Sequence, residues 1–389
     1  MVDLPEYACA CGRSYEVSVG RWRCDCGGVL DLAAVPLAWS PRGDDHSLWR
    51  YADAIPVPGR RFSLGEGMTP LVEASLGGAG SPGGDDGVWF KVEYVSPTGS
   101  FKDRGAVVLA ALADLIGAPR LVADSSGNAG TAMAAYAARA GVAAEIFVPS
   151  GVSEKKLAQI RGHGARVTVV EGPREETARA AVERVEATGA FYASHVYNPF
   201  FYEGTKTYAL EVFEQLGGTA PDALVLPAGN GTLVIGAYLG FAGLRAAGLV
   251  DRVPRIVAVQ AELCAPVAEA FTSGRADVEA WSAAGTAEAP GPGERTVAGR
   301  TVAEGIAIAA PARGARILEI VRETGGAVVT VSEKEIALSH AALAARGLWV
   351  EPTGAVAYAA VRGLRSCGSP LTEGTVVAPL CGSGLKASM

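Results

Sequence analysis

Lys102 lies in the segment Ser96-Pro-Thr-Gly-Ser-Phe-Lys-Asp-Arg-Gly105, where a glycine-containing loop meets the start of an expected helix. A partly buried lysine loses its proton more readily and becomes a usable amine nucleophile, as Schiff-base chemistry requires. On spacing alone, a lysine at the start of a helix is more often a surface cation. The segment therefore indicates a candidate reactive amine.

Two further loops have residue types suited to binding anions. Ser125-Ser-Gly-Asn-Ala-Gly130 follows an expected strand and opens a helix, whose first N–H groups favour an anion. Pro227-Ala-Gly-Asn-Gly-Thr-Leu233 has the same setting, and its small residues let the backbone approach a phosphate. Either loop alone is also compatible with a simple strand-to-helix turn.

Four of the seven cysteines lie near the N-terminus and form two pairs, each followed by glycine: Cys9, Cys11, Cys24 and Cys26. Glycine permits the tight turn that directs two thiolates at one metal ion, so the pattern predicts a zinc-ribbon-like segment. The spacing has one residue between ligands, where two are usual. A ribbon that has lost its metal, or reduced thiols in a small hairpin, remains an alternative interpretation.

The composition sets limits on the class of protein. The chain has 389 residues, 49% of them hydrophobic and 19% charged, which suits two domains with large cores and excludes global disorder. A net charge of −7 argues against a nucleic-acid footprint. We find no apolar signal in Met1–Glu6, no run long enough to span a membrane, and an odd cysteine count that does not fit a disulfide framework. A cytoplasmic protein is expected.

Strands and helices are expected to alternate from residue 88, which predicts an α/β fold with parallel-type sheets covered by helices. The expected strands span residues 88–94, 120–123, 145–148, 166–170, 191–194, 223–226, 255–260, 327–331 and 375–380. The expected helices span residues 103–116, 130–140, 154–162, 175–188, 205–216, 312–323, 333–346 and 353–363. Residues 33–62 are expected to form an extended linker.

The lysine segment resembles the cofactor-lysine motif of fold-type II pyridoxal-phosphate (PLP) enzymes, the tryptophan-synthase-β-like family. Its full string is most similar to threonine synthases and their relatives. Leu64-Gly-Glu-Gly-Met-Thr-Pro-Leu71 resembles the family's stretch ahead of this motif, and the two loops follow in the family's order. The resemblance therefore covers nearly the whole chain.

The resemblance implies a role for each segment. Lys102 would form the Schiff base with PLP and later remove the substrate Cα proton. The loop residues Ser125, Ser126, Gly127, Asn128 and Ala129 would receive the substrate carboxylate, with Asn128 also bonding the cofactor's ring hydroxyl. The phosphate of PLP would be bound by Gly229, Asn230, Gly231, Thr232 and Leu233. Glu304 and Glu351 resemble other segments near the family's active site.

Cys381, in Pro379-Leu-Cys-Gly-Ser-Gly-Leu-Lys386, stands where the family usually has a Thr or Ser facing the pyridine nitrogen. Cysteine can also serve at this position. No carboxylate is available in the motif itself, so the nitrogen is expected to stay unprotonated, which suits elimination because the leaving group accepts the electrons. A buried structural cysteine is the alternative interpretation.

One segment departs from threonine synthases. His195-Val-Tyr-Asn-Pro-Phe-Phe-Tyr-Glu-Gly-Thr-Lys-Thr207 resembles a family segment whose arginine holds the substrate phosphate, and that arginine is here Phe201. An aromatic ring cannot neutralise a phosphate dianion as a guanidinium does. Ala129 also replaces a common threonine. Both changes favour a smaller or less anionic substrate, unless other cations such as Lys155 or Arg161 bind a phosphate.

The fold implied by the resemblance is a two-lobed fold-type II PLP enzyme with an N-terminal zinc-ribbon-like segment. The expected parts are residues 1–40 for the ribbon, 41–96 and 199–389 for the large PLP-binding lobe, and 97–198 for a small mobile lobe. PLP is expected in the cleft between the lobes, and the resemblance also implies a homodimer.

The expected function is a PLP-dependent amino-acid lyase that catalyses β- or γ-elimination or replacement, with threonine synthase as the first named activity. The alternatives are a serine/threonine ammonia-lyase and a β-replacement enzyme of the cysteate- or cysteine-synthase type. A non-catalytic zinc-ribbon binding protein is the alternative from another class.

Overall fold

Two compact units make up the computed structural model, which describes residues 4–74, 87–152, 154–172, 174–281 and 301–386. The first unit consists of Met1–Met68, Ser96–Tyr208 and Ala246–Gly248. The second consists of Thr69–Val95, Ala209–Arg245 and Leu249–Met389. The unit changes at residues 95/96 and 208/209 fall near the expected lobe boundaries, while residues 41–68 group with the first unit. The functional division into lobes stays a prediction.

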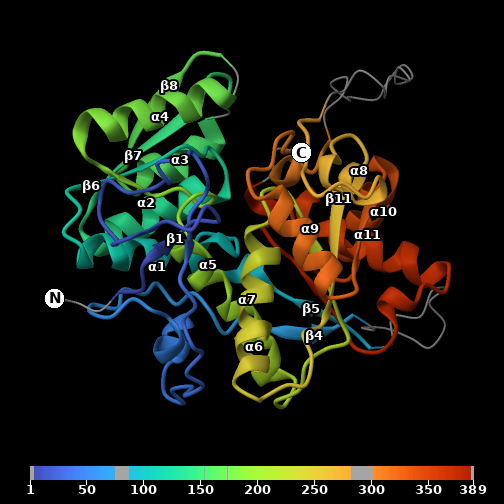
Figure 1. Ribbon diagram of the computed structural model, residues 1–389. Coiled ribbons are helices and arrows are strands. Elements are labelled where there is room, and N and C mark those ends of the chain that lie inside the picture. Colours follow the sequence, from blue (N-terminus) through green and yellow to red (C-terminus); the bar gives the residue numbers. More distant parts are fainter. Residues whose placement is uncertain (1–3, 75–86, 153, 173, 282–300, 387–389) are drawn as a thin grey trace. The chain divides into compact units, whose positions relative to one another are not determined.

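The first unit contains a four-stranded parallel sheet in the order β8-β7-β6-β9 (Figure 1). Its strands are β6 (Arg120–Ala123), β7 (Ala143–Pro149), β8 (Arg166–Val170) and β9 (Phe191–Tyr192). Helices join them, as parallel strands require: α2 (Asn128–Ala140), α3 (Glu154–Gly162) and α4 (Arg174–Thr188). The helix α1 (Lys102–Leu115) precedes the sheet and packs on α2.

Alternating side chains of this sheet enter two separate cores. Leu121 and Ile146 pack with buried residues of α1, α2 and α3. Their chain neighbours Val122 and Phe147 pack instead with Ala181 of α4. Because side chains on a strand alternate between faces, both faces of the sheet are covered, as a parallel sheet requires.

The second unit contains a six-stranded sheet in the order β12-β11-β10-β13-β5-β4. Only the edge strand β4 runs antiparallel to its neighbour. The strands are β4 (Leu71–Glu73), β5 (Val88–Lys91), β10 (Ala223–Pro227), β11 (Arg255–Ala261), β12 (Ala327–Val331) and β13 (Val376–Pro379). The helices are α7 (Thr232–Ala246), α8 (Pro266–Thr272), α9 (Gly314–Glu323), α10 (Glu333–Ala344) and α11 (Pro352–Ser366), of which α11 packs on four strands. The α/β class with parallel-type sheets is thereby confirmed.

Two local expectations differ from the structure. The helix expected at 205–216 is α6 (Thr207–Gln215), and a short helix that was not expected, α5 (Phe200–Thr205), precedes it. The Thr207 hydroxyl donates to the Gly204 carbonyl oxygen at 2.7 Å, and such a side-chain bond competes with the helical backbone ladder. The linker at 33–62 contains a 3₁₀ segment, Leu48–Ala54, anchored by the buried Trp49, whose Nε1 donates to the Phe62 carbonyl oxygen.

Residues 7–32, here called the cysteine knuckle, form a three-stranded antiparallel sheet in the order β2-β1-β3. The strands are β1 (Tyr7–Ala8), β2 (Ser14–Tyr15) and β3 (Asp31–Leu32). Each cysteine pair lies in a turn that glycine closes: the Gly12 N–H donates to the Cys9 carbonyl oxygen, and the Gly27 N–H donates to that of Cys24. The two turns therefore present their thiols in the same way.

None of the helices in the described part of the chain has the length and apolar character needed to cross a bilayer.

Candidate active site

The loop before Lys102 is held rigidly by the first turn of α1. The buried Asp103 carboxylate accepts hydrogen bonds from the Thr98 backbone N–H, at 2.8 Å, and from the Thr98 hydroxyl. The Gly99 N–H closes a tight turn onto the Ser96 carbonyl oxygen at 2.7 Å. Lys102 is the first residue of α1. These hydrogen bonds fix the loop that precedes it.

Two aromatic rings flank the amine of Lys102. Its Nζ lies 4.6 Å from the ring centroid of Phe101 and 5.5 Å from that of Phe201. Phe201 belongs to α5 and is fully buried, while Lys102 is half-buried. Rings in these positions shield the amine from water on two sides and attract it while it is charged.

The helix α5 reaches Lys102 because two glycines allow it to contact α1 closely. A Cβ atom on Gly204 would overlap the carbonyl oxygen of Arg104, and one on Gly105 would lie 2.5 Å from the Phe201 ring. The Arg104 guanidinium also donates to the Thr207 hydroxyl at 3.0 Å. These contacts explain why the lysine motif needs Gly105 and place Phe201 beside Lys102.

The motif ahead of the lysine contributes a buried carboxylate. Glu66 accepts a hydrogen bond from the Tyr136 hydroxyl of α2 at 2.8 Å and from the Leu64 N–H at 2.9 Å. Burial raises the pKa of Glu66, and the hydrogen bonds partly oppose that shift. The residue therefore ties its loop to α2.

The serine- and asparagine-containing loop joins β6 to α2. Ser125, Ser126 and Asn128 are half-buried, Gly127 is exposed, and Ala129 is buried in the first turn of α2. The first N–H groups of a helix lack an intrahelical acceptor, so this end of α2 offers donors to an anion such as a carboxylate.

In the second unit, the glycine-rich loop joins β10 to α7. Gly231 has a φ of +78°, and a Cβ atom there would lie 2.6 Å from the buried Ile317 side chain. A Cβ atom on Gly229 would lie 3.0 Å from the Ile308 side chain and 3.1 Å from the Ile306 Cα. The backbone N–H groups at the start of α7 and the Thr232 hydroxyl form a donor set that fits a phosphate.

Cys381 is buried just past β13, at the carboxyl end of the sheet. The backbone N–H of Glu351 donates to the Gly382 carbonyl oxygen at 2.9 Å, and the Glu351 carboxylate packs so closely that a Cβ atom on Gly382 would overlap it. The cysteine motif has no carboxylate of its own. The structure adds one next to it, from the residue that precedes α11.

Glu304 lies in a short 3₁₀ turn, Glu304–Ile306, and is exposed. The Gly305 N–H donates to the Thr353 hydroxyl at 3.1 Å, which ties the turn to the start of α11. Arg161 forms an ion pair with Glu154 on its own helix. The side chain of Lys155 is outside the described residues, so neither cation is placed at a phosphate site.

The four thiols of the cysteine knuckle converge, with all Sγ atoms within 4.8 Å of one another. Two Sγ pairs lie at 3.6 Å, namely Cys9 with Cys26 and Cys11 with Cys24. Sulfur atoms of a tetrahedral zinc site with Zn–S bonds of about 2.3 Å lie about 3.8 Å apart. The number, type and spacing of the ligands therefore fit zinc.

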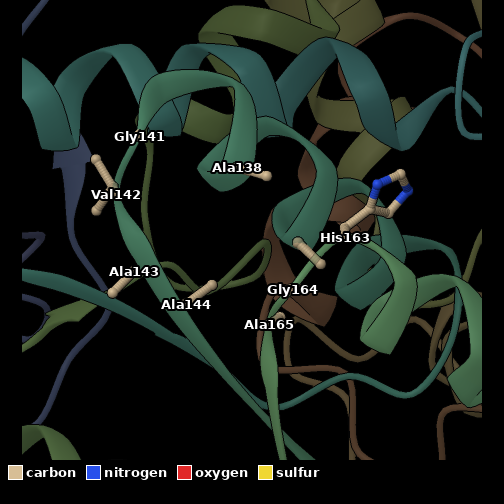
Figure 2. A pocket seen from close by; sticks show the side chains of 9 residues that line it. Ala138, Gly141, Val142, Ala143, Ala144, His163, Gly164 and Ala165 are labelled. Atoms are coloured by element: carbon tan, nitrogen blue, oxygen red, sulfur yellow. The ribbon is translucent and has the colours of Figure 1, made fainter.

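A pocket of about 330 Å³ lies elsewhere in the first unit, between the end of α2 and the start of β7 (Figure 2). Alanine and glycine dominate its lining, with His163 at one side. No residue of the expected cofactor or substrate loops lines it. This pocket lacks the cluster of polar donors that a phosphorylated cofactor needs.

The chain is similar to known proteins over most of its length. A family model described as pyridoxal-phosphate dependent enzyme matches residues 62–382. A threonine synthase of Methanosarcina acetivorans is 32% identical over 97% of this chain and 90% of its own length. One of Methanocaldococcus jannaschii is 30% identical over 97% and 91%. The crystal structure of a T.th. threonine deaminase superposes with a TM-score of 0.63 at 28% identity, covering 78% of this chain and 89% of the other.

The match spans most of the chain and includes the lysine loop, the asparagine loop, the glycine-rich loop and Cys381. The resemblance expected from the sequence, to fold-type II enzymes and to threonine synthases in particular, is confirmed. The chain therefore belongs to the family of pyridoxal-phosphate dependent enzymes.

Proposed function

We propose that the chain is a PLP-dependent lyase that acts on an amino acid by β- or γ-elimination, with or without replacement. The observation that carries this proposal is the similarity to threonine synthases over 97% of the chain, with Lys102 inside the matched family range. Threonine synthase is therefore the first activity to test.

Different residues of the chain would bind the cofactor, bind the substrate and move the proton. Bound PLP supplies an electron sink that stabilises negative charge at the substrate Cα. Lys102 would hold the cofactor covalently and would move the Cα proton. The Ser125–Ala129 loop binds the substrate carboxylate, and Asn128 bonds the ring hydroxyl. The loop before α7 and its first residues, from Gly229 to Leu233, would bind the phosphate. Cys381 would face the ring nitrogen.

A second candidate, serine/threonine ammonia-lyase, is favoured by Phe201. This residue stands where an arginine would bind a substrate phosphate, and it is fully buried 5.5 Å from the Lys102 amine. A β-replacement enzyme of the cysteate- or cysteine-synthase type is favoured on the same ground. An amino-acid panel with and without O-phosphorylation, scored by release of ammonia or phosphate, separates these activities.

Phe201→Arg tests the substrate class. We expect the ratio of kcat/KM for O-phosphohomoserine over that for homoserine or threonine to rise at least about tenfold, because a guanidinium binds phosphate bidentately. The ratio within one variant cancels general damage at this buried site. Phe201→Leu keeps the apolar surface and should leave the ratio unchanged. Efficient threonine formation from O-phosphohomoserine by the wild type would refute the proposal of a less anionic substrate.

The colour of the purified protein distinguishes a PLP enzyme from a non-catalytic protein that only binds a partner through its zinc ribbon. The purified protein should be yellow or become so when PLP is added. A wild-type protein that stays colourless with added PLP would favour the non-catalytic zinc-ribbon alternative.

We also propose that the cysteine knuckle binds one structural zinc ion through Cys9, Cys11, Cys24 and Cys26. The support is the convergence of the four thiols within 4.8 Å. Four thiolates satisfy tetrahedral zinc completely, so the ion would be structural and would take no part in the chemistry.

Cys11→Ser tests the zinc site. We expect about one zinc per chain in the wild type and a large loss in the variant, measured by elemental analysis, because a hydroxyl is a far weaker zinc ligand than a thiolate. Cys367→Ser changes an exposed free cysteine outside the knuckle and should keep the metal. Equal zinc content in both variants would contradict the assignment.

A homodimer and a cytoplasmic location are further proposals, carried over from the family resemblance and from the cysteine pattern respectively. Light scattering of the purified protein measures the first, and fractionation of cells measures the second.

A further inference from the structure

The cysteine knuckle is too small to be stable by itself. Its three strands have two residues each, and segments below about 40 residues usually need a metal, disulfides or a partner surface. The Tyr15 hydroxyl lies 3.1 Å from the Cys24 Sγ, so an aromatic side chain of the knuckle contacts one of the proposed metal ligands. The conformation of the knuckle should therefore depend on the metal.

Two aromatic residues of the knuckle contact residues 192–201, here called the aromatic segment. The Trp22 ring lies 5.2 Å from that of Tyr192 and 5.3 Å from that of Tyr197, both in edge-to-face geometry. The Tyr7 ring meets that of Phe200 edge-to-face at 6.0 Å. The aromatic segment is thus contacted near its start, at its middle and near its end.

The aromatic segment also contacts two parts of the proposed catalytic machinery. At its end, Phe201 flanks the Lys102 amine at 5.5 Å. At its start, the Tyr192 hydroxyl donates to the Asp124 carboxylate at 2.9 Å, immediately before the Ser125–Ala129 loop. A shift of this segment would therefore change both the surroundings of the reactive amine and the anchor of the carboxylate loop.

We propose that the metal-bound cysteine knuckle is a brace that positions Phe201 against Lys102, through Tyr7 and Trp22 acting on the aromatic segment. This inference rests on the zinc site and the catalytic lysine proposed above. Tyr7 and Trp22 are positioning residues, since their contacts reach Lys102 only through other side chains. The metal acts at a distance, by keeping the knuckle folded.

Trp22→Ala tests the brace while leaving all four thiols in place. We expect zinc content to stay at the wild-type level, amide hydrogen exchange in residues 194–201 to rise about tenfold, and kcat to fall about tenfold, because two edge-to-face contacts are lost. The visible band of lysine-bound PLP should also shift, because Phe201 lies beside the Lys102 amine. Trp22→Phe should restore both exchange and kcat.

Trp39→Ala is the matched control. Trp39 is also half-buried in the first unit, and its ring stacks on that of Tyr51. It should change neither exchange in residues 194–201 nor kcat.

The outcomes separate the proposals. A Trp22→Ala protein with full zinc and wild-type exchange, spectrum and kcat would overturn the brace alone. A wild type without zinc would overturn the metal site and the brace with it. Failure of the wild type to bind PLP would overturn the catalytic proposal, while hydrogen exchange would still report on the aromatic contacts.

Discussion

Replacing Lys102 with alanine is expected to remove the visible absorbance of lysine-bound PLP and to lower kcat about 10²- to 10⁴-fold. The amine is the only group proposed both to hold the cofactor covalently and to move the substrate Cα proton. The phosphate loop and Asn128 are unchanged in this variant, so PLP should still bind, without the covalent bond. Absorbance spectra and turnover with the best amino acid of the panel measure the two effects.

Lys102→Arg is the informative companion variant. It keeps a cation between the rings of Phe101 and Phe201, but a guanidinium stays protonated and cannot serve as the nucleophile or the base. Both variants should therefore lose the lysine-bound band, whereas only Lys102→Ala also loses the cation–ring contacts. A lysine-bound band that persists in Lys102→Ala would assign the covalent bond to another lysine.

Lys91 and Lys206, which are both buried, are poorer candidates for the reactive amine. The Lys91 amine lies 2.8 Å from the Glu211 carboxylate and 2.8 Å from the Gln215 side-chain oxygen. Lys206 forms an ion pair with Glu203. A carboxylate partner stabilises the charged form, which opposes nucleophilic attack.

The parts of the fold that the sequence predicted are those with strong local patterns. The helix expected at 103–116 is α1, and the strand expected at 223–226 is β10, each within one or two residues. In both cases periodicity and a bounding glycine or proline agree with the tertiary contacts. The helix α5 was not predicted, because the close approach of Gly204 to Arg104 and the hydrogen bond from Arg104 to Thr207 join residues far apart in the chain.

The candidate site was predictable where residues are contiguous and not where they meet through tertiary packing. The segments around Lys102, Asn128 and Gly231 carry local signals of glycine and small residues. Nothing local indicates that Glu351 packs on Gly382, or that Trp22 contacts Tyr192. Contacts of this kind depend on how elements that are far apart in the sequence pack together in space. A local sequence pattern does not contain that information.

Gly231→Ala is expected to weaken PLP binding about ten- to hundredfold. A non-glycine residue at a φ of +78° costs about 1–3 kcal/mol. The added Cβ would also lie 2.6 Å from Ile317, a fully buried residue of α9 that has little room to move. Relief of both strains must shift the turn whose N–H groups bind the phosphate. Titration of the PLP-free protein with PLP, followed by absorbance, measures the change.

Gly217→Ala separates backbone strain from loss of the phosphate site. Gly217 has a φ of +70°, but a Cβ atom there meets nothing within 4 Å, and the residue lies outside the glycine-rich loop. The two variants share the conformational cost, so both should melt at a lower temperature than the wild type. Only Gly231→Ala should lose PLP affinity, because only there does the backbone form the anion site. Equal PLP affinity in both variants would remove the glycine-rich loop from the proposed cofactor site.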